Sequence, residues 1–211
     1  MDISLIIGSC DKYEFIWDKF FTLFDKYWDH TINMEKYFLT QNKPAHNKYF
    51  IPLCLKDDIW TVFARSALDH IQTKYVLWMQ DDYFLRKTIS RGQFEQYYDF
   101  ILKNNIERFG IHDNSYLYSY ANLGNGYQRF AQNSLYTISM QASIWETEFF
   151  KWCLDQNAET NWQFEIDGSQ RLNCRPHNIY AQFQNPSWYL EALKQGKFTQ
   201  DYHNICREEN L

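Results

Sequence analysis

Two adjacent carboxylates, Asp81 and Asp82, are the residues of this sequence whose position most directly indicates chemistry. They follow Tyr75–Met79, an apolar run typical of a strand buried on both faces inside a parallel sheet. Two ionised carboxylates repel each other, and placing them beside a core costs free energy unless a positive group lies between them. Divalent cations prefer oxygen ligands, and open α/β sheets bind ligands at the carboxyl ends of their strands. We therefore expect a metal-assisted ligand site here, with a surface turn after an edge strand as the alternative.

A second acidic pair, Glu165 and Asp167, alternates with Trp162, Phe164 and Ile166. Three large apolar side chains in so short a stretch do not all face water, so the acids between them lie near apolar surface. Such an environment raises the pKa of a carboxyl group toward that of a working base. The alternative is an acidic helix turn in water.

The first half of the chain alternates strands and helices around these residues. Ile3–Ile7 is a short apolar strand that ends in the turn Gly8-Ser9-Cys10, and the spacing of Asp11 and Glu14 predicts a capping box at the start of a helix. Further strands are expected at 34–39 and 49–55, followed by a helix over 59–71 capped by Asp57 or Asp58. This order favours right-handed βαβ units and a mostly parallel sheet.

The second half is less regular. Ser90 and Gln93 predict another capped helix. Beyond it we expect a strand at Phe109–His112, a loop or hairpin over Tyr116–Tyr127, a strand at Leu135–Met140, a helix capped by Ser143–Glu146, a strand at Arg175–Gln184, a short helix at Ser187–Gln195 and a polar tail. No tract of Pro, Gly or Ser, block of charge or internal repeat divides the chain into domains.

Composition restricts the class of protein. With 211 residues, 45% of them hydrophobic and 22% charged, the chain is long enough for one globular domain. The net charge of −5 and the lack of a Lys/Arg run argue against a nucleic-acid partner. Aromatic residues make up 19% and supply flat faces suited to stacking bases or sugars.

The cysteines and the hydropathy pattern bear on location. Five widely spaced cysteines without a CxxC pair fit reduced thiols in a cytosolic protein. No signal peptide is visible, and no apolar run approaches the ~20 residues of a membrane helix. We expect a cytoplasmic protein, and peripheral contact with the inner face of a membrane through exposed aromatic residues stays open.

The order of these segments resembles a GT-A nucleotide-sugar glycosyltransferase, of the small bacterial or viral type that makes surface polysaccharides. The resemblance rests on the first strand–turn–helix unit, on Asp58-Ile59-Trp60 opening a helix, on Gln80-Asp81-Asp82 after a strand and on Trp162-Gln163-Phe164-Glu165, and it extends from Ile3 to about Gly196. It implies one GT-A (Rossmann-like) α/β domain over 1–211, whose mostly parallel central sheet is flanked by helices. About 1–110 would form the nucleotide-sugar-binding half, and about 111–211 an acceptor-side half with a smaller antiparallel region.

The resemblance also implies roles for particular residues. A divalent cation, Mn²⁺ or Mg²⁺, would bridge the diphosphate and be held by Asp82 first and then Asp81, with His203 or, as an alternative, His177 completing the shell. Gln80 stands where an acid is usual, which weakens the assignment of a ribose ligand. The nucleotide-sugar side would be lined by Gly8, Ser9, Cys10, Asp11, Lys12, Asp57, Asp58, Trp60, Arg65, Gln80 and Asp81, although Trp60 equally fits the core.

The expected activity is sugar transfer from a nucleoside-diphosphate sugar, a UDP-sugar foremost, to a glycan or lipid-linked saccharide. An inverting enzyme needs a base for the acceptor hydroxyl, and Glu165 fits best with Asp167 as the substitute; a retaining enzyme would not need it. One alternative is a nucleotidyltransferase, for which Gly8-Ser9-Cys10 is a poor version of the Gly-rich loop. Another is a non-catalytic carbohydrate-binding module, which the repeated capping boxes disfavour because such modules are usually β-sandwiches.

Overall fold

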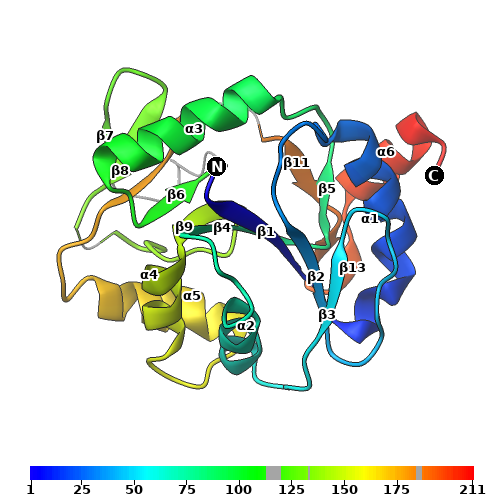
Figure 1. Ribbon diagram of the computed structural model, residues 1–211, viewed down its shortest axis with the longest axis horizontal. Coiled ribbons are helices and arrows are strands. Elements are labelled where there is room, and N and C mark those ends of the chain that lie inside the picture. The colour runs from blue at the N-terminus through cyan, green and yellow to red at the C-terminus, as the bar shows by residue number, and fades with distance from the viewer. Residues whose placement is uncertain (113–119, 133, 184–186) are drawn as a thin grey trace.

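The computed structural model describes residues 1–112, 120–132, 134–183 and 187–211, and its centre is a nine-stranded sheet (Figure 1). The strand order is β3-β2-β1-β4-β9-β6-β10-β8-β7, and β9 and β8 run against the other strands. The strands are β1 Ile3–Gly8, β2 Lys36–Thr40, β3 Ile51–Cys54, β4 Tyr75–Gln80, β6 Arg108–Gly110, β7 Tyr120–Asn122, β8 Tyr127–Phe130, β9 Ser143–Glu146 and β10 Ile179–Gln182. The expected mostly parallel α/β architecture is confirmed.

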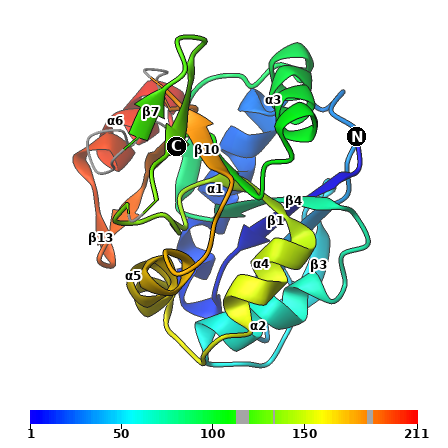
Figure 2. The same ribbon diagram turned by 90° about the vertical axis from the view of Figure 1, so that its left-hand side faces the viewer.

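Helices cover both faces of this sheet (Figures 1 and 2). On one face α1 (Glu14–Tyr27), α3 (Arg91–Asn104) and α6 (Gln200–Glu209) share a core with the sheet, and α1 follows a 3₁₀ turn, η1 (Asp11–Tyr13). On the other face lie α2 (Trp60–Leu68), α4 (Thr147–Leu154) and α5 (Asn161–Leu172). Apart from α6, which packs against β11 (Tyr189–Glu191) of a smaller sheet, these helices bury their apolar stripes against the nine-stranded sheet.

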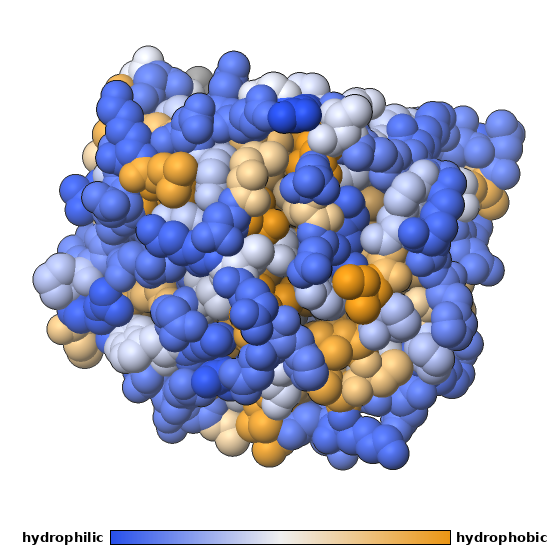
Figure 3. Space-filling view, in the orientation of Figure 1, coloured by the Kyte–Doolittle hydropathy of each residue, from blue (hydrophilic) through white to orange (hydrophobic). Residues whose placement is uncertain are grey.

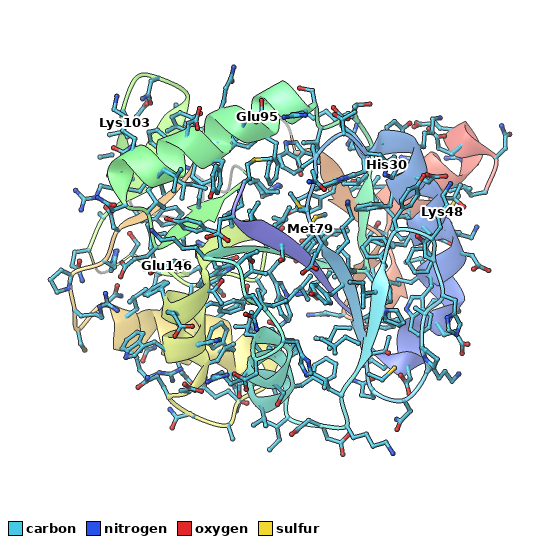
Figure 4. The ribbon with its side chains drawn as sticks, viewed as in Figure 1. His30, Lys48, Met79, Glu95, Lys103 and Glu146 are labelled. Carbon is cyan, nitrogen blue, oxygen red and sulfur yellow. The ribbon has the colours of Figure 1, made fainter. Side chains whose placement is uncertain are left out.

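Strand β4 is buried on both faces, as its apolar run predicts. Tyr75, Leu77 and Met79 point into the core beneath α1 and α3. Val76 and Trp78 point into the core beneath α2, α4 and α5. Met79 lies near the centre of the molecule (Figure 4), so the acids that follow β4 leave the sheet from its middle.

A smaller antiparallel region adjoins this sheet. β5 (Tyr83–Leu85) pairs with β11 (Tyr189–Glu191), and β12 (Leu193–Lys194) forms a hairpin with β13 (Lys197–Phe198) through Gln195 and Gly196, both at positive φ. The expected helix over Ser187–Gln195 is therefore wrong. Its apolar residues Trp188, Tyr189 and Leu190 are buried by pairing with β5 rather than along a helical stripe.

Other segments also differ from the secondary structure that their local sequence predicts. Leu135–Met140 forms turns instead of a strand. Ser143–Glu146 is strand β9, inserted between β4 and β6. The expected helix follows as α4, with Glu146 at its N-cap position but without a side-chain cap hydrogen bond. The polar tail contains α6, whose N-cap Thr199 accepts a hydrogen bond from the Tyr202 N–H. The hairpin β7–β8 confirms part of the expected loop or hairpin at Tyr116–Tyr127, of which 113–119 lie outside the described residues.

Capping was predicted with mixed success. Ser90 caps α3 as expected. Asp11 does not cap α1, because its carboxylate binds another loop. Neither Asp57 nor Asp58 caps α2: the N-cap position is Ile59, whose N–H donates to Asp57. A capping box that was not predicted, Thr160 with Gln163, starts α5.

Within the described ranges no helix is long and apolar enough to span a bilayer. On the face drawn in Figure 3, hydrophobic residues form small groups between hydrophilic ones.

Candidate functional site

The carboxyl ends of β1, β2 and β4 meet at one edge of the sheet. Gly8 and Gln80 end β1 and β4 in register, and the Asp81 N–H donates to the Gly8 carbonyl at 3.1 Å. The Ser9 N–H donates to the Leu39 carbonyl of β2 at 3.0 Å. The first acid after β4 therefore lies beside the turn after β1, as expected for a ligand site of an open α/β sheet.

A cavity of about 330 Å³ opens at this edge, within the range of small-molecule sites. Strand ends, the η1 turn, the segment leading into α2 and the start of α5 form its walls. It is lined by Gly8, Ser9, Cys10, Lys12, Tyr13, Gln41, Asp57, Asp58, Trp60, Phe63, Trp78, Gln80, Asp81 and Asn161. All residues expected on the nucleotide-sugar side are among them, except Asp11 and Arg65.

Asp11 and Arg65 are held elsewhere. The Asp11 carboxylate accepts the backbone N–H groups of Gln41 and Asn42, each at 3.1 Å, and so ties η1 to the loop after β2. Arg65, near the end of α2, forms ion pairs with Asp69 and, at 2.8 Å, with Asp155. Asp11 shapes the pocket indirectly, and Arg65 faces away from it.

Asp81 is almost completely buried, with 2% of its surface exposed. Its Oδ2 accepts from Ser9 Oγ at 2.5 Å and from Trp17 Nε1 at 3.1 Å, and Trp17 Nε1 also donates to Ser9 Oγ at 2.8 Å. Burial raises the pKa of Asp81 to about 7, although these donors act in the opposite direction. The sequence does not reveal Trp17, because it falls on the apolar stripe of α1.

Asp82 points to the antiparallel side instead. Its Oδ1 is buried without a hydrogen-bond partner, and its backbone carbonyl accepts the Ala192 N–H at 2.7 Å. Burial, followed by the charges of Asp81 and Glu191, raises the pKa of Asp82 to about 8. Glu191 lies across from Tyr83 in the β5–β11 pair, and its Oε1 accepts from Gln141 Nε2 at 2.6 Å. Glu191 was missed because its segment was expected to be a helix.

Glu165 and Asp167 lie on different sides of α5. Glu165 is largely buried, and its Oε1 accepts the Met140 N–H at 2.6 Å. Burial raises its pKa, against the hydrogen bonds from Met140 and Ser139 and the charge of Arg108, while the charge of Glu191 adds to the increase. Asp167 is exposed. The structure thus associates Glu165, but not Asp167, with the Asp82–Glu191 side.

The candidate histidines lie apart from the acids. His203 is exposed on α6 beside the rings of Phe198 and Tyr202. His177 is buried just before β10, and burial lowers its pKa against the opposing effect of the charge of Glu107. Among the described residues, no three His, Cys, Asp or Glu side chains converge in a way that could hold a metal ion by themselves.

Trp60 belongs to the pocket and to the core at once. It lines the cavity and packs its ring 6.0 Å from that of Trp78 and 5.3 Å from that of Phe164. Gly8 allows this floor to form, because a Cβ there would lie 2.9 Å from Trp78 Cζ2. The lining is completed by five residues that were not predicted to belong to it: Tyr13, Gln41, Phe63, Trp78 and Asn161.

No protein-family model matches this sequence, and no curated protein matches it either. Solved structures do resemble its fold. S. aureus TarS in complex with UDP is 11% identical, with a TM-score of 0.60 over 98% of this chain and 64% of that one. TarS in complex with UDP-GlcNAc is 14% identical, with a TM-score of 0.60 over 99% of this chain and 65% of that one.

A longer TarS structure is 12% identical, with a TM-score of 0.58 over 99% of this chain and 39% of that one. The chain thus spans less than two thirds of these TarS chains. At such low identity the likeness concerns the fold alone: the chain is a mixed α/β domain similar in fold to TarS, with the large, mostly parallel sheet and the smaller antiparallel region that were expected.

Proposed function

We propose that this chain is a glycosyltransferase that takes a sugar from a nucleoside-diphosphate sugar, a UDP-sugar foremost. The observation that carries the proposal is the cavity at the carboxyl edge of β1 and β4, which combines the turn after β1, the segment leading into α2 and the buried acid Asp81. The TarS structures of similar fold, which contain UDP and UDP-GlcNAc, support the same class of donor. The glycan or lipid-linked acceptor and the cytoplasmic location stay predictions.

Asp81 and Asp82 are the residues that would hold a divalent cation, Mn²⁺ or Mg²⁺. The unpartnered, buried Oδ1 of Asp82 fits this assignment. So do the pKa values of the two adjacent carboxylates, which burial raises in both and the charge of Asp81 raises further in Asp82. Few protein ligands are needed, because magnesium sites commonly combine one or two carboxylates with substrate phosphates and water. When bound, the cation would stabilise negative charge on the departing diphosphate.

Glu165 is the candidate base. A base works best when its pKa lies near the operating pH, and burial moves the pKa of Glu165 in that direction. The Met140 N–H fixes the orientation of its carboxylate. We propose that Glu165 accepts the proton of the acceptor hydroxyl as that oxygen attacks the anomeric carbon, which is the inverting mechanism.

Thermal denaturation with a panel of nucleotides tests the proposal. UDP-GlcNAc, UDP-glucose, GDP-mannose and UTP would each be added with Mn²⁺ or with EDTA. We expect a diphosphate sugar to raise the melting temperature most, and more with Mn²⁺, because ligand binding to the folded state stabilises it. Stabilisation by UTP alone would instead favour a nucleotidyltransferase, and stabilisation by no nucleotide would contradict both.

A further inference from the structure

A row of aromatic side chains leads away from the cavity across the outside of the molecule. We call Tyr13, Phe15, Phe198, Tyr202 and His203 the aromatic ledge. Tyr13 lines the cavity, and its ring lies 6.1 Å from that of Phe15. Phe15 meets Phe198 at 5.8 Å, and Phe198 stacks on Tyr202 at 4.0 Å. Segments distant in sequence, η1–α1 and β13–α6, thus form one continuous surface.

The two phenylalanines of the ledge are unusually open to solvent. Phe15 exposes 58% of its surface and Phe198 exposes 41%. Phe198 is nevertheless supported by the core, because Tyr202 beneath it packs against the buried ring of Phe84 at 5.9 Å. Phe15 is supported in turn by its contacts with Tyr13 and Phe198. Apolar rings that are exposed and fixed bind a ligand without the entropy loss of ordering them.

The hairpin that carries Phe198 is attached to the acid pair. The Ala192 N–H, directly before β12, donates to the Asp82 carbonyl at 2.7 Å. Directly after β13, the Thr199 N–H closes the hairpin on the Ala192 carbonyl at 3.0 Å. The hairpin projects from the body of the molecule (Figure 2). The ledge is therefore connected to the site at both Tyr13 and Asp82.

The charge around the ledge is balanced. Segments 11–19 and 193–203 together contain Lys12, Lys19, Lys194 and Lys197 against Asp11, Glu14, Asp18 and Asp201. An anionic lipid surface attracts clusters of uncompensated basic residues, which these segments lack. Flat ring faces surrounded by balanced charge suit the apolar C–H faces of an uncharged pyranose.

We propose that the aromatic ledge binds a saccharide chain, the acceptor, and directs one of its ends to the cavity. This inference rests on the proposed function and adds to it a substrate class and a location: an oligosaccharide on Phe15 and Phe198. Phe15 and Phe198 do not line the donor cavity, so donor binding and saccharide binding can be measured separately.

The experiment compares the wild-type chain with the double variant Phe15→Ala/Phe198→Ala and with Leu102→Ala. Leu102 is 41% exposed on α3 and serves as the matched control. Saturation-transfer NMR would measure binding of cellohexaose, maltohexaose and chitohexaose, and calorimetry would measure binding of UDP with Mn²⁺. Sedimentation with vesicles of phosphatidylcholine and phosphatidylglycerol would measure membrane binding. Thermal denaturation would verify that each variant is folded, and the single variant Phe198→Ala is used if the double one is not.

We expect at least one hexasaccharide to bind, and the double variant to bind it about ten-fold more weakly, since aromatic contacts contribute of that order. UDP binding should be unchanged in both variants. Binding of no hexasaccharide, or equal binding by the double variant and wild type, would overturn the inference, as would vesicle binding that depends on the same two rings in place of saccharide binding. If the wild-type chain binds a hexasaccharide but does not bind UDP, the proposed donor is rejected and saccharide binding by the aromatic ledge is not.

Discussion

Asp81 and Asp82 are neighbours in the chain, yet their surroundings are opposite. Asp81 is buried at the carboxyl edge of the parallel strands, where Ser9 and Trp17 donate hydrogen bonds to its carboxylate. Asp82 faces the antiparallel β5–β11 side, where its Oδ1 has no partner and Glu191 adds like charge. Hydrogen bonds from the protein thus orient the carboxylate of Asp81, whereas Oδ1 of Asp82 has no hydrogen-bond donor. The comparison teaches that two adjacent carboxylates can differ in how firmly the protein orients them, which makes Asp82 the more available of the two for the proposed cation.

The largest expected effect concerns the antiparallel side. Glu165→Gln should keep donor binding and lower sugar transfer by about 10²–10⁴-fold, because the amide cannot accept the hydroxyl proton. Glu191→Gln is the matched control on the same side. Initial rates and UDP affinity would be measured for both. A greater loss of transfer in Glu191→Gln would move the base from Glu165 to Glu191.

Asp82→Ala should remove the dependence of donor binding on Mn²⁺ and lower transfer by about 10²–10³-fold, since the departing diphosphate loses electrostatic stabilisation. Calorimetry with UDP, with Mn²⁺ and with EDTA, measures this, and the highly exposed Glu148→Ala is the control. An unchanged affinity for UDP in the presence of Mn²⁺ would remove Asp82 from the metal site.

The parallel side should respond more mildly. Trp17→Phe removes the indole N–H that orients Asp81 but keeps an aromatic ring in the core, so the affinity for UDP should fall about ten-fold, as for loss of a hydrogen bond to a charged group. Trp28→Phe, another buried tryptophan of the same core, is the control. If both substitutions change UDP affinity equally, the effect is one of packing and the role of the indole N–H is refuted.

The smallest expected effect is on stability. The folded-state pKa of Asp81 is raised from 3.8 to about 7, so the unfolded chain loses its proton first and the wild type loses stability as the pH rises through this window. Asp81→Asn avoids this loss and should be more stable than wild type by about 1–3 kcal/mol at pH 8, yet nearly equal at pH 4. Urea denaturation in EDTA measures both. A difference that does not depend on pH would show that Asp81 ionises normally.

Much of the parallel half could be predicted from sequence. The apolar runs before Gly8 and Gln80 are strands because a strand that is buried on both faces is mostly apolar, which leaves a local signal. The residues at the ends of those strands follow directly, and most of the expected nucleotide-sugar residues line one cavity. Arg65 does not, since sequence spacing alone could not show that its partners are Asp69 and Asp155.

By itself, the sequence determined the alternating α/β order and the carboxylates at the end of β4, because strand burial and helix periodicity are local properties of neighbouring residues. Only the tertiary structure decided that Trp17 and Ser9 hold Asp81, that Glu191 faces Asp82, and that Ser143–Glu146 forms a strand between β4 and β6. These contacts join residues far apart in the chain. Which residues meet in these contacts depends on how the sheets and helices pack together, and a pattern of neighbouring residues does not contain that information.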